Sequence, residues 1–428
     1  NMSHVGFIDQ GYKPNLTKDL LATFYMEPNG PFEEAADAVA GESSIGSWTD
    51  LSTLKPEVAK KLKATVYYIN QKQNIIKIAY PLDLFELGSI PQFMSSIGGN
   101  IYSMKVVKNL RLLDVEFPTK YIKSFQGPAF GIEGIRKVLK NKDRIILGSI
   151  IKPKVGLTAV EHSKVAYDVW RNGIDLVKDD ENLTDMTFNR FDERVKRTLA
   201  MRDKVEKETG QIKVYACNVT APPDEMLRRA KLVKSLGGRC VMVDIVSTGL
   251  DNVQYLRKQK LGLIIHGHRA GHSMFTRNPK HGMTMLMVSK LARLAGIDQL
   301  HTGTVVGKME GSADEVLTVN ELLREDWHEF NSLKEDWSSI KPTMPIASGG
   351  MHPGLLPKLV EILGSDLIAN FGGGVHGHQG GSIAGAKACR QAAEAIVREI
   401  DLADYAVTNP ELKVALDQWG NIKYKYRR

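Results

Sequence analysis

The chain is poor in cysteine, with only Cys217, Cys240 and Cys389 among its 428 residues. An odd number of widely spaced cysteines argues against a disulfide framework and fits a reducing compartment, so a cytoplasmic location is expected. No apolar run approaches the roughly 18–20 residues of a membrane-spanning helix, and no signal peptide is recognisable. These absences exclude a small disulfide-stabilised secreted protein and a helical membrane protein.

The overall composition is that of an ordinary globular protein. Hydrophobic residues make up 43% and charged residues 25% of the chain, and its length allows two or three domains. The net charge is +8 and the isoelectric point is near 9.1. The basic residues are dispersed and no nucleic-acid-binding motif is visible, so nucleic acid is not expected as a partner. A solvated basic surface explains the charge most simply, and attraction for an anionic substrate is a second explanation.

Residues 1–126 mix strand-like and helical segments. Apolar residues alternate in Ala64–Ile69 and Asn74–Tyr80, which predicts two paired antiparallel strands, whereas Ile90–Ile97 has a helical pattern. We therefore expect a smaller α+β N-terminal domain over residues 1–126.

From residue 127 to residue 415, apolar runs alternate regularly with amphipathic stretches. Eight runs are predicted as strands: Ile145–Ile151, Ile174–Lys178, Lys213–Asn218, Cys240–Val246, Gly262–His268, Gln299–Gly303, Met344–Ser348 and Asp366–Phe371. Eight strand–helix units match the size of a TIM (β/α)8 barrel. A doubly wound open sheet is the alternative, but polar motifs follow six of the strands, and only a closed ring directs six strand ends to one centre. The fold class predicted is α/β, a C-terminal TIM barrel followed by a C-terminal tail at 416–428.

The second predicted strand ends in a dense group of charged residues. Lys178 is followed by Asp179, Asp180, Glu181 and Asn182, and the catalytic groups of TIM barrels lie where strands end. Two carboxylates and a third oxygen donor suit Mg²⁺. A lysine ammonium would repel that cation, whereas a carbamate, formed by adding CO₂ to the amine, would bind it. A solvated charged turn is the more ordinary explanation when this pattern stands alone.

The first and fifth strands are followed by cationic and imidazole groups. Lys152 and Lys154 come after the first strand, and alternation along an extended segment would place both on one side; two surface lysines in a loop are the alternative. After the fifth strand, Arg269 suits a phosphate and His268 suits a substrate hydroxyl. A zinc pair formed by His268 and His272 is disfavoured, because no further ligand stands nearby.

The sixth, seventh and eighth strands lead into glycine-rich loops. His301 ends the sixth strand, and Lys308 stands among glycines in the loop that follows. These residues alone favour a flexible surface loop; a mobile lid that delivers a cation is the alternative. Ser348-Gly349-Gly350 and Gly372-Gly373-Gly374 follow the last two strands, where TIM barrels bind phosphate. Two anion sites beside a metal would fit a linear sugar bisphosphate.

Together these motifs resemble the large chain of ribulose-1,5-bisphosphate carboxylase/oxygenase (RuBisCO), in its archaeal form III type. The likeness spans nearly the whole chain. It rests on GESSIGSWTD (41–50), SSIGGNIYSMK (95–105), GSIIKPKVG (148–156), LVKDDEN (176–182), HGHRAGH (266–272), HTGTVVGKMEG (301–311), ASGGMHPG (347–354) and FGGGVHGH (371–378).

The resemblance implies Mg²⁺-dependent carboxylation and cleavage of ribulose 1,5-bisphosphate with CO₂ to two 3-phosphoglycerates, and an oxygenase side reaction with O₂. Lys178, as a carbamate, would bind the metal with Asp180 and Glu181 and would abstract the C3 proton. The other catalytic residues implied are Lys152, His268 and Lys308. The substrate-binding residues implied are Glu42, Ser47, Trp48, Asn100, Lys154, Arg269, His301, Ser348, Gly349, Gly350, Gly372 and Gly373.

The resemblance also implies a homodimer, or a higher assembly of dimers, without a small subunit. Residues 1–126 of one chain would then cap the active site of its partner. Ile150, Gly271 and Asn370 depart from the better-known plant pattern, but no catalytic group is missing. The main alternative is a RuBisCO-like enolase or isomerase that acts on a sugar phosphate without fixing CO₂; a non-catalytic sugar-phosphate sensor is a second.

Overall fold

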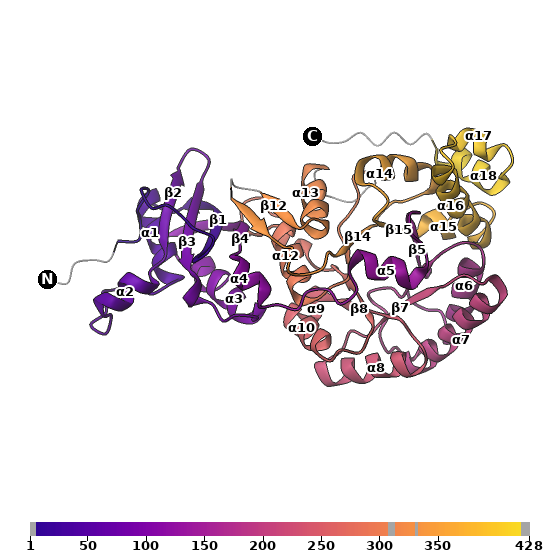
Figure 1. Cartoon of the computed structure of the whole chain (residues 1–428), viewed down its shortest axis with the longest axis horizontal. Coiled ribbons are helices and arrows are strands. Elements are labelled where there is room, and N and C mark those ends of the chain that lie inside the picture. Colours follow the sequence, from indigo (N-terminus) through magenta and orange to yellow (C-terminus); the bar gives the residue numbers. More distant parts are fainter. Residues whose placement is uncertain (1–5, 307–312, 330–332, 421–428) are drawn as a thin grey trace. The chain divides into compact units, whose positions relative to one another are not determined.

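The structure of the chain is a computed structural model that describes residues 6–306, 313–329 and 333–420 (Figure 1). By their contacts, the residues fall into two compact units. The first comprises 1–127, 271–295 and 325–340, and the second 128–270, 296–324 and 341–428. The first unit therefore includes two segments that lie, in sequence, among the strands of the barrel.

A five-stranded sheet in the order β10-β4-β1-β3-β2 forms the centre of the first unit. β1 (Asp19–Pro28) pairs antiparallel with β3 (Ile75–Pro81) and β4 (Val107–Glu116), and β2 (Thr65–Asn70) pairs antiparallel with β3. The short β10 (Gly282–Met283) adds a parallel edge to β4. The antiparallel pair predicted for the N-terminal domain, observed as β2 and β3, is confirmed.

Short helices and one hairpin accompany this sheet. The described helices of the unit are α1 (Phe32–Glu42), α2 (Pro56–Leu62), α3 (Ile90–Ile97), α4 (Thr119–Lys123), α11 (Ser273–Thr276) and α12 (Met285–Ala295), with 3₁₀ turns at Leu82–Leu84 and Asn100–Ser103, and the hairpin is β12 (Trp327–Glu329) with β13 (Lys334–Asp336). Within the unit, Phe93, Phe117 and Tyr121 form an aromatic cluster, in which the rings of Phe117 and Tyr121 stack 5.1 Å apart. Such stacking adds to the burial of apolar area that holds the unit together.

Eight parallel strands form a closed barrel in the second unit. Around the ring they are β5 (Ile146–Ile150), β6 (Leu176–Lys178), β7 (Val214–Asn218), β8 (Cys240–Asp244), β9 (Ile264–His268), β11 (Gln299–His301), β14 (Met344–Ala347) and β15 (Ile368–Phe371), which pairs with β5. Each observed strand lies within the range predicted for it. The prediction of a closed barrel is therefore confirmed, and the open sheet is excluded.

Helices surround the ring, as Figure 1 shows for α6, α7 and α8. Those of the second unit are α5 (Gly131–Leu139), α6 (Ala159–Arg171), α7 (Phe191–Thr209), α8 (Pro223–Ser235), α9 (Ile245–Thr248), α10 (Leu250–Lys258), α13 (Ala313–Arg324), α14 (Leu356–Leu363), α15 (Gly373–His376), α16 (Ser382–Val397), α17 (Leu402–Ala406) and α18 (Pro410–Trp419), with a 3₁₀ turn at Pro353–Leu355. α18 continues to Trp419, within the range predicted for the tail. Among the described residues, no helix has the length and apolarity needed to cross a membrane.

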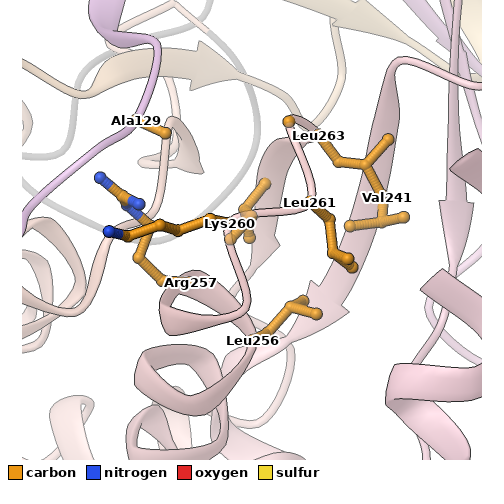
Figure 2. A pocket seen from close by; sticks show the side chains of 9 residues that line it. Ala129, Val241, Leu256, Arg257, Lys260, Leu261 and Leu263 are labelled. Atoms are coloured by element: carbon orange, nitrogen blue, oxygen red, sulfur yellow. The ribbon is translucent and has the colours of Figure 1, made fainter. Parts of the chain in front are cut away.

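The barrel interior is apolar towards the N-terminal ends of the strands. Ile146, Leu176 and Val214 belong to one buried cluster, which Ile135 and Leu139 of α5 join. α5 thus closes this end of the barrel. A cavity of about 20 Å³ lies nearby against β8 and β9, between the side chains of Val241, Leu256 and Leu263 (Figure 2). Its volume suits one water molecule and no larger ligand.

Candidate active site

The predicted barrel residues gather at the carboxyl ends of the strands. Lys178, His268 and His301 are the last residues of β6, β9 and β11, and Ser348 and Gly372 directly follow β14 and β15. This is the end at which TIM barrels carry their catalytic groups. The barrel therefore brings these residues to one face, although they are up to 194 positions apart in the sequence.

Lys178 is a buried amine next to acidic groups. Its side chain is 1% exposed, and its Nζ lies 3.8 Å from Glu181 Oε2. Burial lowers the pKa of Lys178, whereas the charges of Glu181, Asp180 and Asp244 raise it. A neutral amine is the form that reacts with CO₂, so the burial of Lys178 favours carbamate formation. With Asp180 and Glu181, a carbamate here would offer an all-oxygen ligand set of the kind that Mg²⁺ prefers; these residues therefore fit the predicted ion.

Asp179, between the predicted metal ligands, has a different role that the sequence did not reveal. It is fully buried and accepts hydrogen bonds from Tyr215 Oη (2.6 Å), the Asn218 backbone N–H (2.9 Å) and Arg194 Nε (3.3 Å), and His162 Nε2 lies 3.0 Å from its Oδ1. Burial by itself raises the pKa of Asp179, but Arg194, His162 and Tyr215 lower it well below its usual value. Asp179 is thus a fixed anion that anchors the segment bearing the ligands on either side of it.

We expect Asp179→Asn to destabilise the protein by about 3–5 kcal/mol, because Arg194 would be left buried without its counter-charge. The amide retains the shape of the side chain, so the loss reports the charge. The shift in the urea midpoint of the holoprotein measures the effect. The matched control is Glu193→Gln on α7, the helix that carries Arg194. The ion pair between Glu193 and Arg197 is about half exposed on both sides, so its loss should cost less than about 1 kcal/mol. Equal shifts for the two variants would contradict the anchoring role.

Asp244 and Asn218 are two further site residues that sequence reasoning missed. Asp244 ends β8, and its Oδ1 has no hydrogen-bond partner among the described residues. Burial raises the pKa of Asp244 to about 7, against the opposing charge of Lys178. Asn218 ends β7 and donates from Nδ2 to the carbonyl oxygens of Glu181 (3.2 Å) and Leu183 (3.1 Å). Both residues stand at or near the ends of predicted strands, and this position was the sequence signal by which they could have been found.

Imidazole rings form a connected chain on the opposite side of the barrel. His266 Nε2 and His301 Nε2 share a hydrogen bond of 2.8 Å, and His301 Nδ1 lies 3.0 Å from Ser348 Oγ. Burial lowers the pKa of His266 to about 3 and that of His301 well below its usual value, so both rings are neutral at physiological pH. The chain joins β9, β11 and the loop after β14, and it holds both rings in place.

His268 lies between His301 of this imidazole chain and the carboxylate of Glu181. Its ring lies 4.4 Å from that of His301, and its Nε2 is 3.5 Å from Glu181 Oε2. Nδ1 accepts a hydrogen bond from the Ala270 backbone N–H (3.0 Å), so the neutral ring carries its proton on Nε2. His268 therefore presents a protonated Nε2 towards Glu181.

Arg269 occupies space that a glycine leaves open. A side chain at Gly303, whose φ is +81°, would bring its Cβ within 2.8 Å of Arg269 Nη2. Burial lowers the pKa of Arg269 to about 10, which still leaves the guanidinium charged at neutral pH. A partly desolvated, charged fork of this kind suits a phosphate.

The segment after β5 differs from its predicted conformation. Residues 152–155 bend rather than extend, so the alternation argument for placing Lys152 and Lys154 on one side does not apply. Lys152 is half-buried, and a Cβ at Gly372 would lie 3.2 Å from its Cε. Lys152 thus lies against the loop after β15, whereas Lys154 is exposed.

Four of the remaining predicted residues belong to the first unit. Glu42 ends α1, Ser47 and Trp48 follow it in an exposed stretch, and Asn100 begins a 3₁₀ turn, all within the first unit. Lys308 lies outside the described residues. Gly349 and Gly350 follow Ser348 with φ values of +101° and +67°, and Gly373 begins α15. The left-handed conformations after β14 explain the need for glycine there.

The first unit contains the only group of three described acidic or imidazole side chains whose ligand atoms all lie within 4.8 Å of one another. It consists of Asp114, His328 and Glu335. Lys290 Nζ already lies 2.7 Å from Asp114 Oδ1 and 2.5 Å from Glu335 Oε1, and it donates to the Val115 carbonyl. A protein cation therefore satisfies this cluster, and we do not assign a metal to it.

The fold and the site together define a TIM-barrel enzyme in which a buried lysine with carboxylates, imidazole rings and a guanidinium group lie at the carboxyl ends of the strands. Comparison with known proteins identifies its family. Residues 131–419 match the family described as "ribulose bisphosphate carboxylase large chain, catalytic domain". Residues 6–121 match the family described as the N-terminal domain of the same large chain. The chain belongs to the RuBisCO large-chain family.

Archaeal relatives match along their full length. Ribulose bisphosphate carboxylase of Methanosarcina acetivorans is 50% identical over 422 residues, covering 96% of this chain and 98% of the relative. That of Pyrococcus abyssi is 48% identical over 427 residues, covering 99% and 98%. Among solved structures, the dimeric archaeal Rubisco of Hyperthermus butylicus superimposes with a TM-score of 0.92 at 45% identity, covering 97% and 99% of the two chains. The octameric Rubisco of Pyrococcus horikoshii, in complex with sulfate, gives 0.91 at 47% identity, covering 97% of each chain.

Proposed function

We propose that the protein carboxylates ribulose 1,5-bisphosphate with CO₂ and cleaves the product to two molecules of 3-phosphoglycerate. The single observation that carries this proposal is the buried amine of Lys178 beside Glu181, at the carboxyl end of a barrel strand. Full-length relatives named ribulose bisphosphate carboxylase support the same reaction. O₂ would compete with CO₂ for the same substrate-derived carbanion, which gives an oxygenase side reaction.

The cofactors proposed are Mg²⁺ and an activating CO₂ bound as a carbamate on Lys178. Lys178, Asp180 and Glu181 would hold the ion, which supplies Lewis-acid stabilisation of negative charge that develops on the substrate. Asp179 and Asn218 hold the ligand segment in place through their hydrogen bonds. Because a carbamate requires a neutral amine, the environment that lowers the pKa of Lys178 also prepares it for activation.

The protein groups around this centre fit the proton transfers of the reaction. The Lys178 carbamate would remove the C3 proton, after which a bond forms between C2 and CO₂. Water adds at C3, and the bond between C2 and C3 then breaks. His268, whose neutral ring has its proton on Nε2, and Lys152 would serve the later proton transfers. Lys154 would support the centre.

The two phosphates would bind at separate places on the barrel face. Arg269 and the His301–Ser348 pair would form one side, and the backbone N–H groups of Gly349, Gly350, Gly372 and Gly373 the other. Neutral His301 can donate or accept a hydrogen bond without adding charge. This division suits a linear substrate with an anionic group at each end.

A homodimer, or an assembly of dimers, is proposed as the active form. Glu42, Ser47, Trp48 and Asn100 would complete the pocket of the partner chain. Trp48 is 92% exposed, and an aromatic side chain of this size suits burial in a complex. Related structures are described as dimeric and octameric, which supports this proposal, and no small subunit is expected.

The test is incubation of the enzyme with ribulose 1,5-bisphosphate, Mg²⁺ and labelled bicarbonate. We expect labelled 3-phosphoglycerate, with one label for every two molecules formed. An enolase or isomerase would instead convert or exchange the substrate without incorporating label. Consumption of the bisphosphate without labelled product would contradict the proposal.

Lys308→Ala tests the proposed role of the lid lysine. We expect the variant to retain exchange of the C3 proton with solvent but to lose most carboxylation, because the metal ligands and Lys178 remain while the cation that orients CO₂ is removed. The two rates are measured on the same preparation, by loss of tritium from C3 and by fixation of labelled CO₂. A fall in both rates by the same factor would show that Lys308 does not act mainly at the CO₂ step.

A further inference from the structure

A second, larger cavity lies at the other end of the barrel from the active site. It has a volume of about 430 Å³ and is lined by the loops that precede β5, β6 and β7 and by α16. These loops lead into the amino ends of the strands, whereas the catalytic groups follow the carboxyl ends. The volume falls within the range of small-molecule sites, roughly 300–1,000 Å³.

Cationic side chains converge on one carboxylate in this cavity. Asp175 accepts hydrogen bonds from Arg144 Nη1 and Nη2 at 3.0 and 2.8 Å and from the Leu147 backbone N–H at 2.9 Å. Arg390 Nη1 lies 3.4 Å from the same carboxylate and donates to the Gly173 carbonyl at 2.9 Å. A carboxylate shared between two guanidinium groups neutralises only one of them.

A third cation lies directly behind this group. Lys213 is fully buried, and its Nζ donates to the Ile174 carbonyl at 2.7 Å and to Gln211 Oε1 at 3.2 Å. The pKa of Lys213 is lowered to about 8, chiefly by burial; the charges of Arg390 and Arg144 act in the same direction, and that of Asp175 opposes them. The effect of both arginine charges on Lys213 shows that the three cationic side chains lie close together.

Acidic groups near the cavity do not balance these charges. Glu394 approaches Arg390 at 3.7 Å but is 43% exposed, and Glu206 is already paired with Arg239 at 2.9 Å. At the rim, Lys140 and Lys142 are exposed and form no ion pair with any described residue, against the single carboxylate of Asp143. The lining therefore keeps an excess of positive charge, which favours an anion.

Part of the cavity wall is apolar. Leu139, Ile212 and Val397 line it, from the end of α5, the loop before β7 and the end of α16. A site that pairs guanidinium and ammonium groups with an apolar wall suits a ligand that has both a phosphate and an apolar part, since planar guanidinium groups complement phosphate oxygens.

We propose that this cavity binds a small organic phosphate, with the phosphate near Arg390 and Lys142 and the apolar part against Ile212 and Val397. The barrel's catalytic groups lie at the other end, so the ligand is an effector and not the substrate. The proposal does not depend on the reaction proposed above.

Calorimetric titration of the full-length protein with phenyl phosphate tests this inference, with inorganic phosphate and phenol as partial ligands. We expect phenyl phosphate to bind most tightly, inorganic phosphate more weakly, and phenol not measurably. Lys142→Glu should weaken phenyl phosphate binding roughly tenfold, because a nearby cation becomes an anion. The matched control is Lys413→Glu on α18, an exposed lysine that does not line the cavity. Its binding should match that of wild type.

Two outcomes would overturn the proposal. Equal weakening by Lys142→Glu and Lys413→Glu would mean that phenyl phosphate responds only to the overall charge of the protein. Equal affinity for inorganic and phenyl phosphate would show that the apolar wall makes no contact with the ligand. Crystals soaked in phenyl phosphate give an independent reading, since the proposal requires ligand density between Arg390 and Ile212.

Discussion

Replacement of Lys178 by alanine is expected to abolish carboxylation while leaving the fold intact. The side chain ends β6 and is 1% exposed among acidic groups, so its loss removes the proposed carbamate, a metal ligand and the base for the C3 proton together. Activity should fall by at least about 10³-fold, as for loss of a group used directly in the chemical step. The measurement is labelled-CO₂ fixation, with circular dichroism to confirm folding.

The same role predicts how wild-type activity responds to activation. Preincubation with CO₂ and Mg²⁺ at mildly alkaline pH should raise the initial rate. Burial lowers the pKa of Lys178, and the fraction of Lys178 in the neutral amine form increases with pH. Lys196→Ala, an exposed lysine on α7, serves as the control and should activate normally. Full activity of Lys178→Ala would remove the carbamate from the mechanism.

Mixing two inactive variants should restore activity if each active site is built from two chains. Glu42→Gln lies in the first unit and Lys178→Met in the barrel, and each is expected to be nearly inactive alone. In a mixed dimer, one composite site would carry both lesions and the other would carry neither. Random reassortment makes half the dimers mixed, so up to about a quarter of wild-type activity should return.

A second pair of variants serves as the control, because it distinguishes recovery through a shared site from general stabilisation of one variant by its partner chain. When Lys178→Met is combined with His268→Ala, both lesions lie in the barrel, so every site of a mixed dimer keeps one defect and no recovery is expected. Activity of the co-expressed variants is measured before and after tandem-tag purification of mixed dimers, which should raise the recovery for Glu42→Gln with Lys178→Met from about a quarter to about half of wild type. If Glu42→Gln and Lys178→Met form mixed dimers without recovering activity, the shared-site model is wrong.

The barrel was predictable because its strands are buried on both faces. Such strands appear as short apolar runs, for example Ile264–His268, and the helices between them have a clear period. The fold of the first unit was harder to predict from the sequence. β4 pairs with β10 between Arg111 and Gly282, 171 positions apart in the sequence, and no local pattern encodes a pairing over that separation.

The same limit applies within the site. The positions of Lys178, Asp180 and Glu181 followed from the end of one apolar run, but the different role of Asp179 did not, since four charged residues in succession look equivalent. Asp179 is distinguished by Arg194, 15 residues later, and by Tyr215 on the neighbouring strand. The extended conformation predicted for Lys152 to Lys154 was wrong for a related reason, because the chain bends immediately after β5.

The most direct measurement of the central claim is to locate the activating CO₂ on the chain. The enzyme is activated with ¹³C-labelled bicarbonate and Mg²⁺, the carbamate is trapped by methylation, and the peptides are mapped by mass spectrometry. We predict one trapped carbamate per chain, on Lys178, with an occupancy that rises in parallel with carboxylase activity. Fully active enzyme with no adduct on Lys178, or with the adduct on another lysine, would contradict the account.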